Sequence, residues 1–153
     1  MRLLTILLII ALAGAGVFWG LTRPNALPAG AMTGLSGDAG RGQRIFWAAG
    51  CASCHVAPDA PVSDVPILSG GQRFPSPFGT FIAPNISPDP GNGIGGWTAL
   101  DLANAMLRGV SPDGQHYFPA FPYTSYAKMT ARDVIDLHAY LITLPRSTAP
   151  NQP

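Results

Sequence analysis

The sequence predicts an all-α head preceded by a single apolar helix, and three observations support this fold class. Three segments, residues 39–49, 99–108 and 131–144, repeat apolar residues at helical spacing. No segment alternates apolar and polar residues as a half-buried strand would. The chain opens with a long uncharged apolar run of the kind that crosses a membrane.

The apolar run follows Arg2 and extends from Leu3 to Leu21, nineteen residues without a charge. As a helix it spans roughly 28 Å, close to the ~30 Å hydrocarbon thickness of a bilayer. A cleaved signal peptide is the alternative, because Ala11-Leu12-Ala13 resembles a small-residue cleavage site. The run continues well past that site, so we expect residues 1–21 to be an uncleaved transmembrane anchor. By the positive-inside rule, Arg2 stays on the cytoplasmic side of the membrane, and the residues after the anchor lie on the opposite side.

The segment after the anchor, residues 22–37, is rich in Pro, Gly and Ala and lacks periodicity, which predicts a flexible linker. Fully extended it reaches at most ~55 Å. The head, residues 38–153, then contains the three predicted helices, whose ends carry capping signals. These are Asp38, the pairs Thr98–Asp101 and Thr130–Asp133, and the stop residues Gly109 and Pro145.

The composition excludes two classes of protein. A hydrophobic content of 47% excludes a disordered chain. Residues 23–153 contain eight basic and eight acidic side chains and offer no basic patch for nucleic acid.

Only 11% of all residues are charged, against about 25% in an average domain. Two explanations of this low charge content stay open. One is compositional drift, and the other is a surface covered by a permanent partner, since interface cores are depleted of charge.

The two cysteines of the chain lie together in the segment Cys51-Ala52-Ser53-Cys54-His55. This spacing is typical of haem c attachment, in which both thiols form thioethers and the adjacent imidazole binds iron. A dithiol redox motif would need a βαβ context, and a zinc site would need ligand-spaced partners, which His116 and His138 do not form. A disulfide would leave the adjacent histidine unexplained. We therefore expect one haem c, bound by Cys51 and Cys54, with His55 as proximal iron ligand.

A long stretch between the first two helices fits this cofactor. Residues 56–96 contain eight prolines and seven glycines and no periodic pattern. A structureless loop of this length normally counts against a compact domain. A haem supplies apolar surface around which such a loop can wrap.

These features resemble the class I cytochromes c. Gly42 and Phe46 match their Gly-x-x-x-aromatic pattern, which implies that Gly42 lets the first and last helices cross closely. The expected contacts on the last helix are Leu137, Tyr140 and Leu141. The fold implied for residues 38–153 is about three helices with long loops wrapped around one haem.

A second element of the same resemblance concerns the proximal ligand. The segment Val65–Gly70 is similar to the Pro-x-Leu-x-Gly segment that follows the haem motif in that family. This implies that the carbonyl of Pro66 accepts a hydrogen bond from the His55 ring. The alternative, that Pro66 is an ordinary turn proline, stays open.

Four segments are more specifically similar to the cytochrome subunits of bacterial membrane-bound dehydrogenases for alcohols, sugars and aldehydes. They are residues 77–97, 109–123, 128–130 and 137–141. The similarity implies an electron-transfer protein, not itself an enzyme, with its head on the periplasmic side of a bacterial inner membrane. Its redox partners would be a dehydrogenase or quinol-oxidising complex upstream and an oxidase or soluble cytochrome downstream. Many such subunits carry three haem domains, whereas this chain has one haem motif.

Two alternative functions remain from the sequence. One is a haem enzyme of the peroxidase or thiosulfate-oxidising type, which needs an exchangeable sixth ligand. The other is a structural subunit with a vestigial haem. A methionine as sixth ligand would favour electron transfer over a haem enzyme of either type, because a His/Met pair suits an electron carrier.

The choice of sixth ligand rests on Met129, which lies one residue before the cap of the last helix. In class I cytochromes the distal loop delivers its sulfur there. Phe121 stands where many relatives have methionine, so another residue must take the role. Met106 fits a core position, Met32 lies in the linker, and His116 would make a bis-histidine site. We expect Met129, with Tyr123 and Tyr126 steadying its loop.

Three further residues are candidates for binding the haem propionates: Trp97, Arg73 and Arg108. Buried carboxylates need charge-assisted partners, and these side chains can supply them. Ordinary packing or a surface position explains any one of the three better than a propionate contact.

Overall fold

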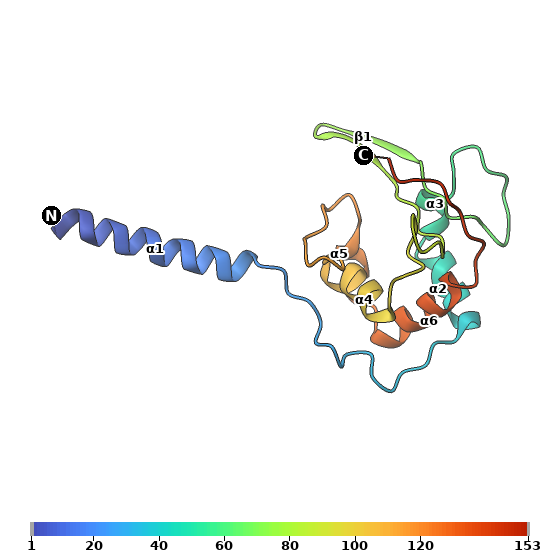
Figure 1. Cartoon of the computed structure of the whole chain (residues 1–153), viewed down its shortest axis with the longest axis horizontal. Coiled ribbons are helices and arrows are strands. Elements are labelled where there is room, and N and C mark those ends of the chain that lie inside the picture. Colours follow the sequence, from blue (N-terminus) through green and yellow to red (C-terminus); the bar gives the residue numbers. More distant parts are fainter. Residues whose placement is uncertain (1, 153) are drawn as a thin grey trace.

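The computed structural model describes residues 2–152. Figure 1 shows a head of short helices and long loops, from which one helix projects alone. The elements in chain order are α1 (Arg2–Thr22), α2 (Ala39–Ala48), α3 (Cys51–His55), β1 (Arg73–Ser76), β2 (Gly79–Ile82), α4 (Ala99–Arg108), α5 (Tyr123–Tyr126) and α6 (Ala131–Leu141). The mostly helical head and the apolar N-terminal helix are both as the sequence predicts.

Helix α1 is apolar on every face, and none of its residues is buried. Its length and composition meet the requirement for crossing a membrane, a requirement that signal sequences also meet. Near its end the Arg23 guanidinium lies 5.6 Å from the centre of the Trp19 ring. Aromatic and basic side chains together are typical of a membrane–water boundary.

The head is built on a close crossing of α2 and α6. A Cβ atom at Gly42 would overlap the backbone carbonyl of Asp136 and the Tyr140 side chain. Phe46 is fully buried one turn later, with its ring centre 5.3 Å from that of Tyr140. The prediction that Gly42 permits this approach is confirmed, and Tyr140 is among the contacts predicted for it.

The predicted caps are also confirmed, and two helices end earlier than expected. Asp38 accepts from the Arg41 N–H, and Thr98 and Thr130 each form a complete capping box. Helix α2 ends at Ala48 because Gly50 takes a left-handed conformation, φ 71°. Helix α6 ends at Leu141, where the chain tightens into i→i+3 hydrogen bonds that carry it to the buried Leu144.

An antiparallel hairpin, β1–β2, was not predicted from the sequence. Its strands pair from Arg73 opposite Ile82 to Ser76 opposite Gly79. Both strands are short and largely exposed, so they carry no buried alternating face to detect. Pro75 within β1 also argues against a strand in a sequence, although edge strands accept proline.

The long loop that contains this hairpin returns to α3. The Gly70 N–H donates to the His55 carbonyl at 2.7 Å, and the Ile86 N–H donates to the Leu68 carbonyl at 3.0 Å. The side chain of Asn85 donates to the carbonyls of Ser147 and Ala149, which ties the C-terminal segment over the loop. The loop is therefore ordered by backbone pairing that leads it past the haem motif.

The segment predicted as a linker lies along the head, passing beneath α4 and α6 in Figure 1. His116 Nε2 lies 2.8 Å from the Thr22 carbonyl, and the Leu27 N–H donates to Asn104 Oδ1 at 2.7 Å. Arg132 donates to the Ser36 carbonyl at 2.9 Å. The segment is thus held at three points, and its flexibility stays a prediction.

Candidate haem site

Helix α3 presents the two cysteines one turn apart. Residues three positions apart share a helix face, so the Cys51 and Cys54 side chains lie on the same side of the helix. Both thiols are free and partly buried. Burial raises the pKa of Cys51 to about 11, so this thiol is protonated at neutral pH. A dithiol redox motif depends on a lowered thiol pKa, and that interpretation of the motif is therefore disfavoured.

His55 is held at its ring and at its backbone. Its Nδ1 lies 2.8 Å from the carbonyl oxygen of Pro84, which can only accept, so Nδ1 carries the proton. The His55 carbonyl accepts from the Gly70 N–H at 2.7 Å. Burial lowers the pKa of His55, although the Pro84 carbonyl opposes this shift. The imidazole is therefore neutral, with the lone pair of Nε2 free to bind a metal.

The acceptor of this hydrogen bond corrects the prediction for Pro66. Pro66 is buried, but the carbonyl that meets the His55 ring belongs to Pro84, 29 residues away in sequence from the histidine. The reason is the close packing of Gly70 (φ 72°), where a Cβ would overlap the backbone of Ala83 and Pro84. This contact sets the Pro84 carbonyl beside the imidazole.

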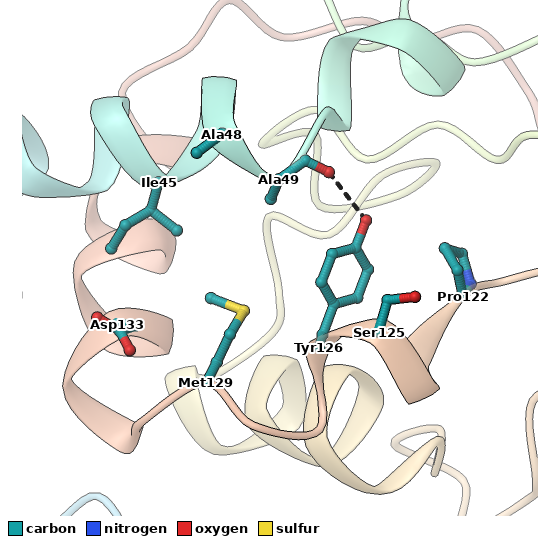
Figure 2. Close-up of a pocket in the computed structure, with 8 residues that line it drawn as sticks. All are labelled: Ile45, Ala48, Ala49, Pro122, Ser125, Tyr126, Met129 and Asp133. Atoms are coloured by element: carbon teal, nitrogen blue, oxygen red, sulfur yellow. Dashed lines mark hydrogen bonds between the residues drawn. The ribbon is translucent and has the colours of Figure 1, made fainter.

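The residues around Met129 form a cavity of ≈ 540 Å³ between α2, α5 and α6. Figure 2 shows the Met129 side chain extending from the α5–α6 connection toward α2. The residues lining the cavity are Ile45, Ala48, Ala49, Pro122, Ser125, Tyr126, Met129 and Asp133. Tyr126 crosses it and donates from its hydroxyl to the Ala49 carbonyl at 3.0 Å. The lining is mostly apolar, which suits the side chain of a methionine.

Tyr126 also relates this cavity to the cysteines. The pKa of the Tyr126 phenol is raised, first by burial and then by the charge that Cys51 and Cys54 carry when ionised. Its hydroxyl is bonded to the Ala49 carbonyl, and Ala49 precedes Cys51 by two residues. His55 is not among the described residues that line the cavity. The structure thus brings Met129 to the neighbourhood of α3, and its role as a ligand stays a prediction.

The other residues considered for the sixth position have different surroundings. Met106 is 4% exposed in the core, and Met32 packs at the edge of the same core. The His116 ring is bonded to the Thr22 carbonyl, and the His138 ring lies 3.0 Å from the Trp97 carbonyl. None of these four side chains is among the described residues that line the cavity beside Met129.

Phe121 belongs to a group of aromatic rings on the same loop. Its ring centre lies 5.6 Å from Tyr117, 6.3 Å from Tyr123 and 6.0 Å from Tyr126. The loop is therefore stiffened by ring contacts around Phe121.

The three residues predicted for the propionates are not gathered by the structure. Trp97 packs against the core, whereas Arg73 on β1 and Arg108 at the end of α4 are exposed. They come from separate elements, and among the described residues no contact joins them. Their role in binding a haem stays a prediction.

The donors present on α3 fit a haem c, because two free thiols one turn apart precede an imidazole whose other nitrogen is already satisfied. Comparison with known sequences agrees: residues 39–145 match the Cytochrome c family. The chain belongs to this family. Membership makes it a c-type cytochrome, an electron carrier, and implies haem c attachment through Cys51 and Cys54.

The relatives of this cytochrome include a diheme cytochrome c-type protein of Cereibacter sphaeroides, 54% identical over 96% of this chain and 49% of its own length. The fructose dehydrogenase cytochrome subunit of Gluconobacter japonicus is 37% identical over 67% of this chain and 20% of its own length. A nicotinate dehydrogenase subunit of Pseudomonas putida is 42% identical over 67% of this chain and 8% of its own length. The chain thus spans about half of the first relative and far less of the others.

Proposed function

We propose that this cytochrome is a membrane-anchored carrier of single electrons on the periplasmic side of a bacterial inner membrane. It binds one haem c and connects a dehydrogenase or quinol-oxidising complex to a terminal acceptor. The observation that carries this proposal is the fixed imidazole of His55, bonded through Nδ1 to the Pro84 carbonyl at 2.8 Å. A ligand held in one orientation suits a site that must change its charge without changing its structure.

The residues of the chain have distinct tasks in this function. Bound haem supplies the one-electron couple. Cys51 and Cys54 would hold it covalently, and His55 would be the proximal ligand through Nε2. Bonding of Nδ1 to a backbone carbonyl raises the basicity of the ligating nitrogen and fixes the ring plane.

Met129 is the proposed distal ligand. A thioether is a soft, neutral donor that favours the reduced metal, and a His/Met pair gives a high potential. Two neighbours support this role: Thr130 caps α6 directly after Met129, and Tyr126 ties the loop to Ala49. Among the methionines of the described head, Met129 lines the cavity between α2, α5 and α6, whereas Met106 is in the core.

The membrane anchor is proposed for α1. Every residue of this helix is exposed, and its apolar faces need an apolar environment. The similarity to the diheme cytochrome covers 96% of this chain, so it includes most of α1. The other two relatives are a cytochrome subunit of fructose dehydrogenase and a subunit of nicotinate dehydrogenase. Their names support a dehydrogenase as electron donor.

Carbon monoxide binding to the reduced full-length protein tests the proposed function. An electron carrier with both axial positions filled should keep its reduced absorption spectrum under carbon monoxide. Rapid formation of a carbon monoxide adduct would contradict the proposal and favour a haem enzyme with an exchangeable sixth ligand.

The anchor has a separate test. Mass spectrometry of the mature protein from washed membranes should find residues 3–21 retained and a single haem adduct. A mature chain that lacks this segment and appears in the soluble periplasmic fraction would contradict anchoring and leave electron transfer intact.

A further inference from the structure

Three aromatic side chains gather on the hairpin, at its turn and on β2, and on the loop between α4 and α5. Phe78 is 83% exposed and Phe118 is 55% exposed. The ring of Phe81 stacks on that of Phe118, with 4.8 Å between their centres, and Phe78 meets Phe118 edge-on at 6.1 Å. We call Phe78, Phe81 and Phe118 the aromatic foot. Contiguous exposed apolar groups of this kind mark interaction surfaces.

The aromatic foot lies on the side of the head from which α1 leaves. His116, two residues before Phe118, is bonded through Nε2 to the carbonyl of Thr22, the last residue of α1. In Figure 1 the hairpin tip and the α4–α5 loop both project toward the α1 side of the head. A bilayer crossed by α1 would therefore end next to this loop.

The charges around the foot suit the boundary of a bilayer. Residues 74–82, from Phe74 to Ile82, contain no charged side chain, and residues 110–120 contain one, Asp113. Arg23, beside Trp19 at the end of α1, and the exposed Arg73 at the base of the hairpin supply positive charge. Aromatic rings flanked by basic groups favour the headgroup layer of membranes with anionic lipids.

We propose that the aromatic foot inserts into the headgroup layer of the bilayer that α1 crosses, as a second membrane contact. This inference rests on the proposed membrane anchor. The head is then docked on the membrane at two places, α1 and the foot, and does not swing freely on residues 23–37. Docking fixes the orientation of α3 relative to partners in the same membrane.

The test uses full-length holoprotein in vesicles of phosphatidylethanolamine and phosphatidylglycerol. Thr80→Cys, an exposed position on β2, carries a nitroxide spin label and leaves the foot intact. Val62→Cys carries the same label on the α3–β1 loop, where Val62 is fully exposed. This loop projects from the opposite side of the head in Figure 1. Collision rates with molecular oxygen and with a water-soluble nickel chelate report whether each label is in lipid or in water.

We expect the label at position 80 to collide several-fold less with the nickel chelate than the label at position 62. Replacing the foot with Phe78→Asp and Phe118→Asp should restore most of this access. The matched double variant Val62→Asp and Val65→Asp also places two acidic residues at exposed apolar positions, and it should leave the shielding unchanged. Absorption spectra verify that each variant retains its haem.

Other outcomes overturn the proposal in distinguishable ways. Vesicle flotation with a fully water-accessible label at position 80 would overturn the foot and leave the anchor intact. Failure of the protein to float with vesicles would overturn the anchor and the foot together. Shielding that appears only with added membrane proteins, or only when the cytochrome is concentrated, would assign the foot to a protein partner or a second copy.

Discussion

On the α3 side of the site His55 is held by two hydrogen bonds to backbone atoms, whereas on the α5 side Met129 is held by packing around a cavity. The partners of His55 are the Pro84 carbonyl and the Gly70 N–H, which are both backbone groups. A substitution at either position keeps these groups, except that a proline at position 70 would remove the N–H. The Met129 surroundings depend on side chains such as Ile45 and Tyr126. The α3 side is thus suited to constant attachment of a cofactor. On the α5 side, substitutions of side chains can change the properties of the bound cofactor.

The largest expected effect comes from breaking the α3 side. The double variant Cys51→Ser, Cys54→Ser removes both covalent attachments, and residues 56–96 then lose the apolar haem surface that we expect them to wrap. We expect no haem stain on a denaturing gel and no cooperative unfolding transition.

Ser53→Ala provides the control within the same motif. Its hydroxyl donates to the Gly50 carbonyl at 2.6 Å, an exposed bond worth about 0.5–1.5 kcal/mol. This variant should keep its haem and unfold cooperatively. Retention of covalent haem by the double variant would contradict the assignment of both thiols.

Removing the Met129 side chain from the α5 side should leave the covalent haem attachment intact and change the ligation and the potential of the iron. Met129→Ala should keep the haem stain, open the sixth position to carbon monoxide, abolish the sulfur-to-iron charge-transfer band and lower the potential strongly. Spectra and potentiometry of the purified protein measure these changes.

Met106→Leu is the matched control, because Met106 is buried in the core and a volume-conserving swap costs under about 1.5 kcal/mol. It should keep the wild-type spectrum and potential. If Met129→Ala keeps them too, while His116→Ala loses them, the haem is bis-histidine and the assignment of Met129 is wrong.

The two sides also differ in how far the sequence predicts them. The CxxCH spacing, the capping boxes and Gly42 are local or short-range patterns, and the structure has the caps and the close crossing where they were expected. The Pro84 carbonyl could not be predicted from such patterns, because its position depends on how Gly70 packs against residues 83 and 84. The hairpin was missed for a related reason. Its short exposed strands and prolines carry no periodic signal, and pairing alone defines it.

A third variant tests the scaffold on which both sides depend, the crossing of α2 and α6. Gly42→Ala places a Cβ against the Asp136 carbonyl and should cost about 1–3 kcal/mol of unfolding free energy. At Gly96 a Cβ meets nothing within 4 Å, so Gly96→Ala should stay within about 0.5 kcal/mol of the wild type. Denaturant unfolding measures both, and equal effects would show that the crossing tolerates a wider spacing.

A smaller effect is expected from the link between the α5 side and α2. Tyr126→Phe removes the hydrogen bond to the Ala49 carbonyl and keeps the ring in the cavity. We expect a loss of about 0.5–1.5 kcal/mol and an increased rate of carbon monoxide binding, since the loop before Met129 is less restrained. An unchanged unfolding free energy would mean that the ring alone holds the loop.

The last effect is confined to acid pH and concerns Asp136, which is 1% exposed beneath the α2–α6 crossing. Arg41 donates from Nε to Asp136 at 2.7 Å and lowers the pKa of this carboxyl; burial opposes the shift, and the Asp38 N–H reinforces it. A carboxyl whose pKa is lower in the folded state stabilises the fold above its unfolded pKa, about 3.9. That contribution is lost as the pH falls through the lower, folded pKa.

Asp136→Asn should therefore unfold more easily than the wild type at pH 7, and the difference between the two should narrow below about pH 4. Asp59→Asn, in the exposed loop after α3, is the control and should follow the wild-type curve throughout. The measurement is the unfolding free energy of the wild type and of both variants at pH values from 7 downward. Parallel curves for wild type and Asp136→Asn would show that the Arg41–Asp136 pair does not link protonation to folding. In that case the buried carboxylate would serve chiefly to accept the Asp38 N–H at the start of α2.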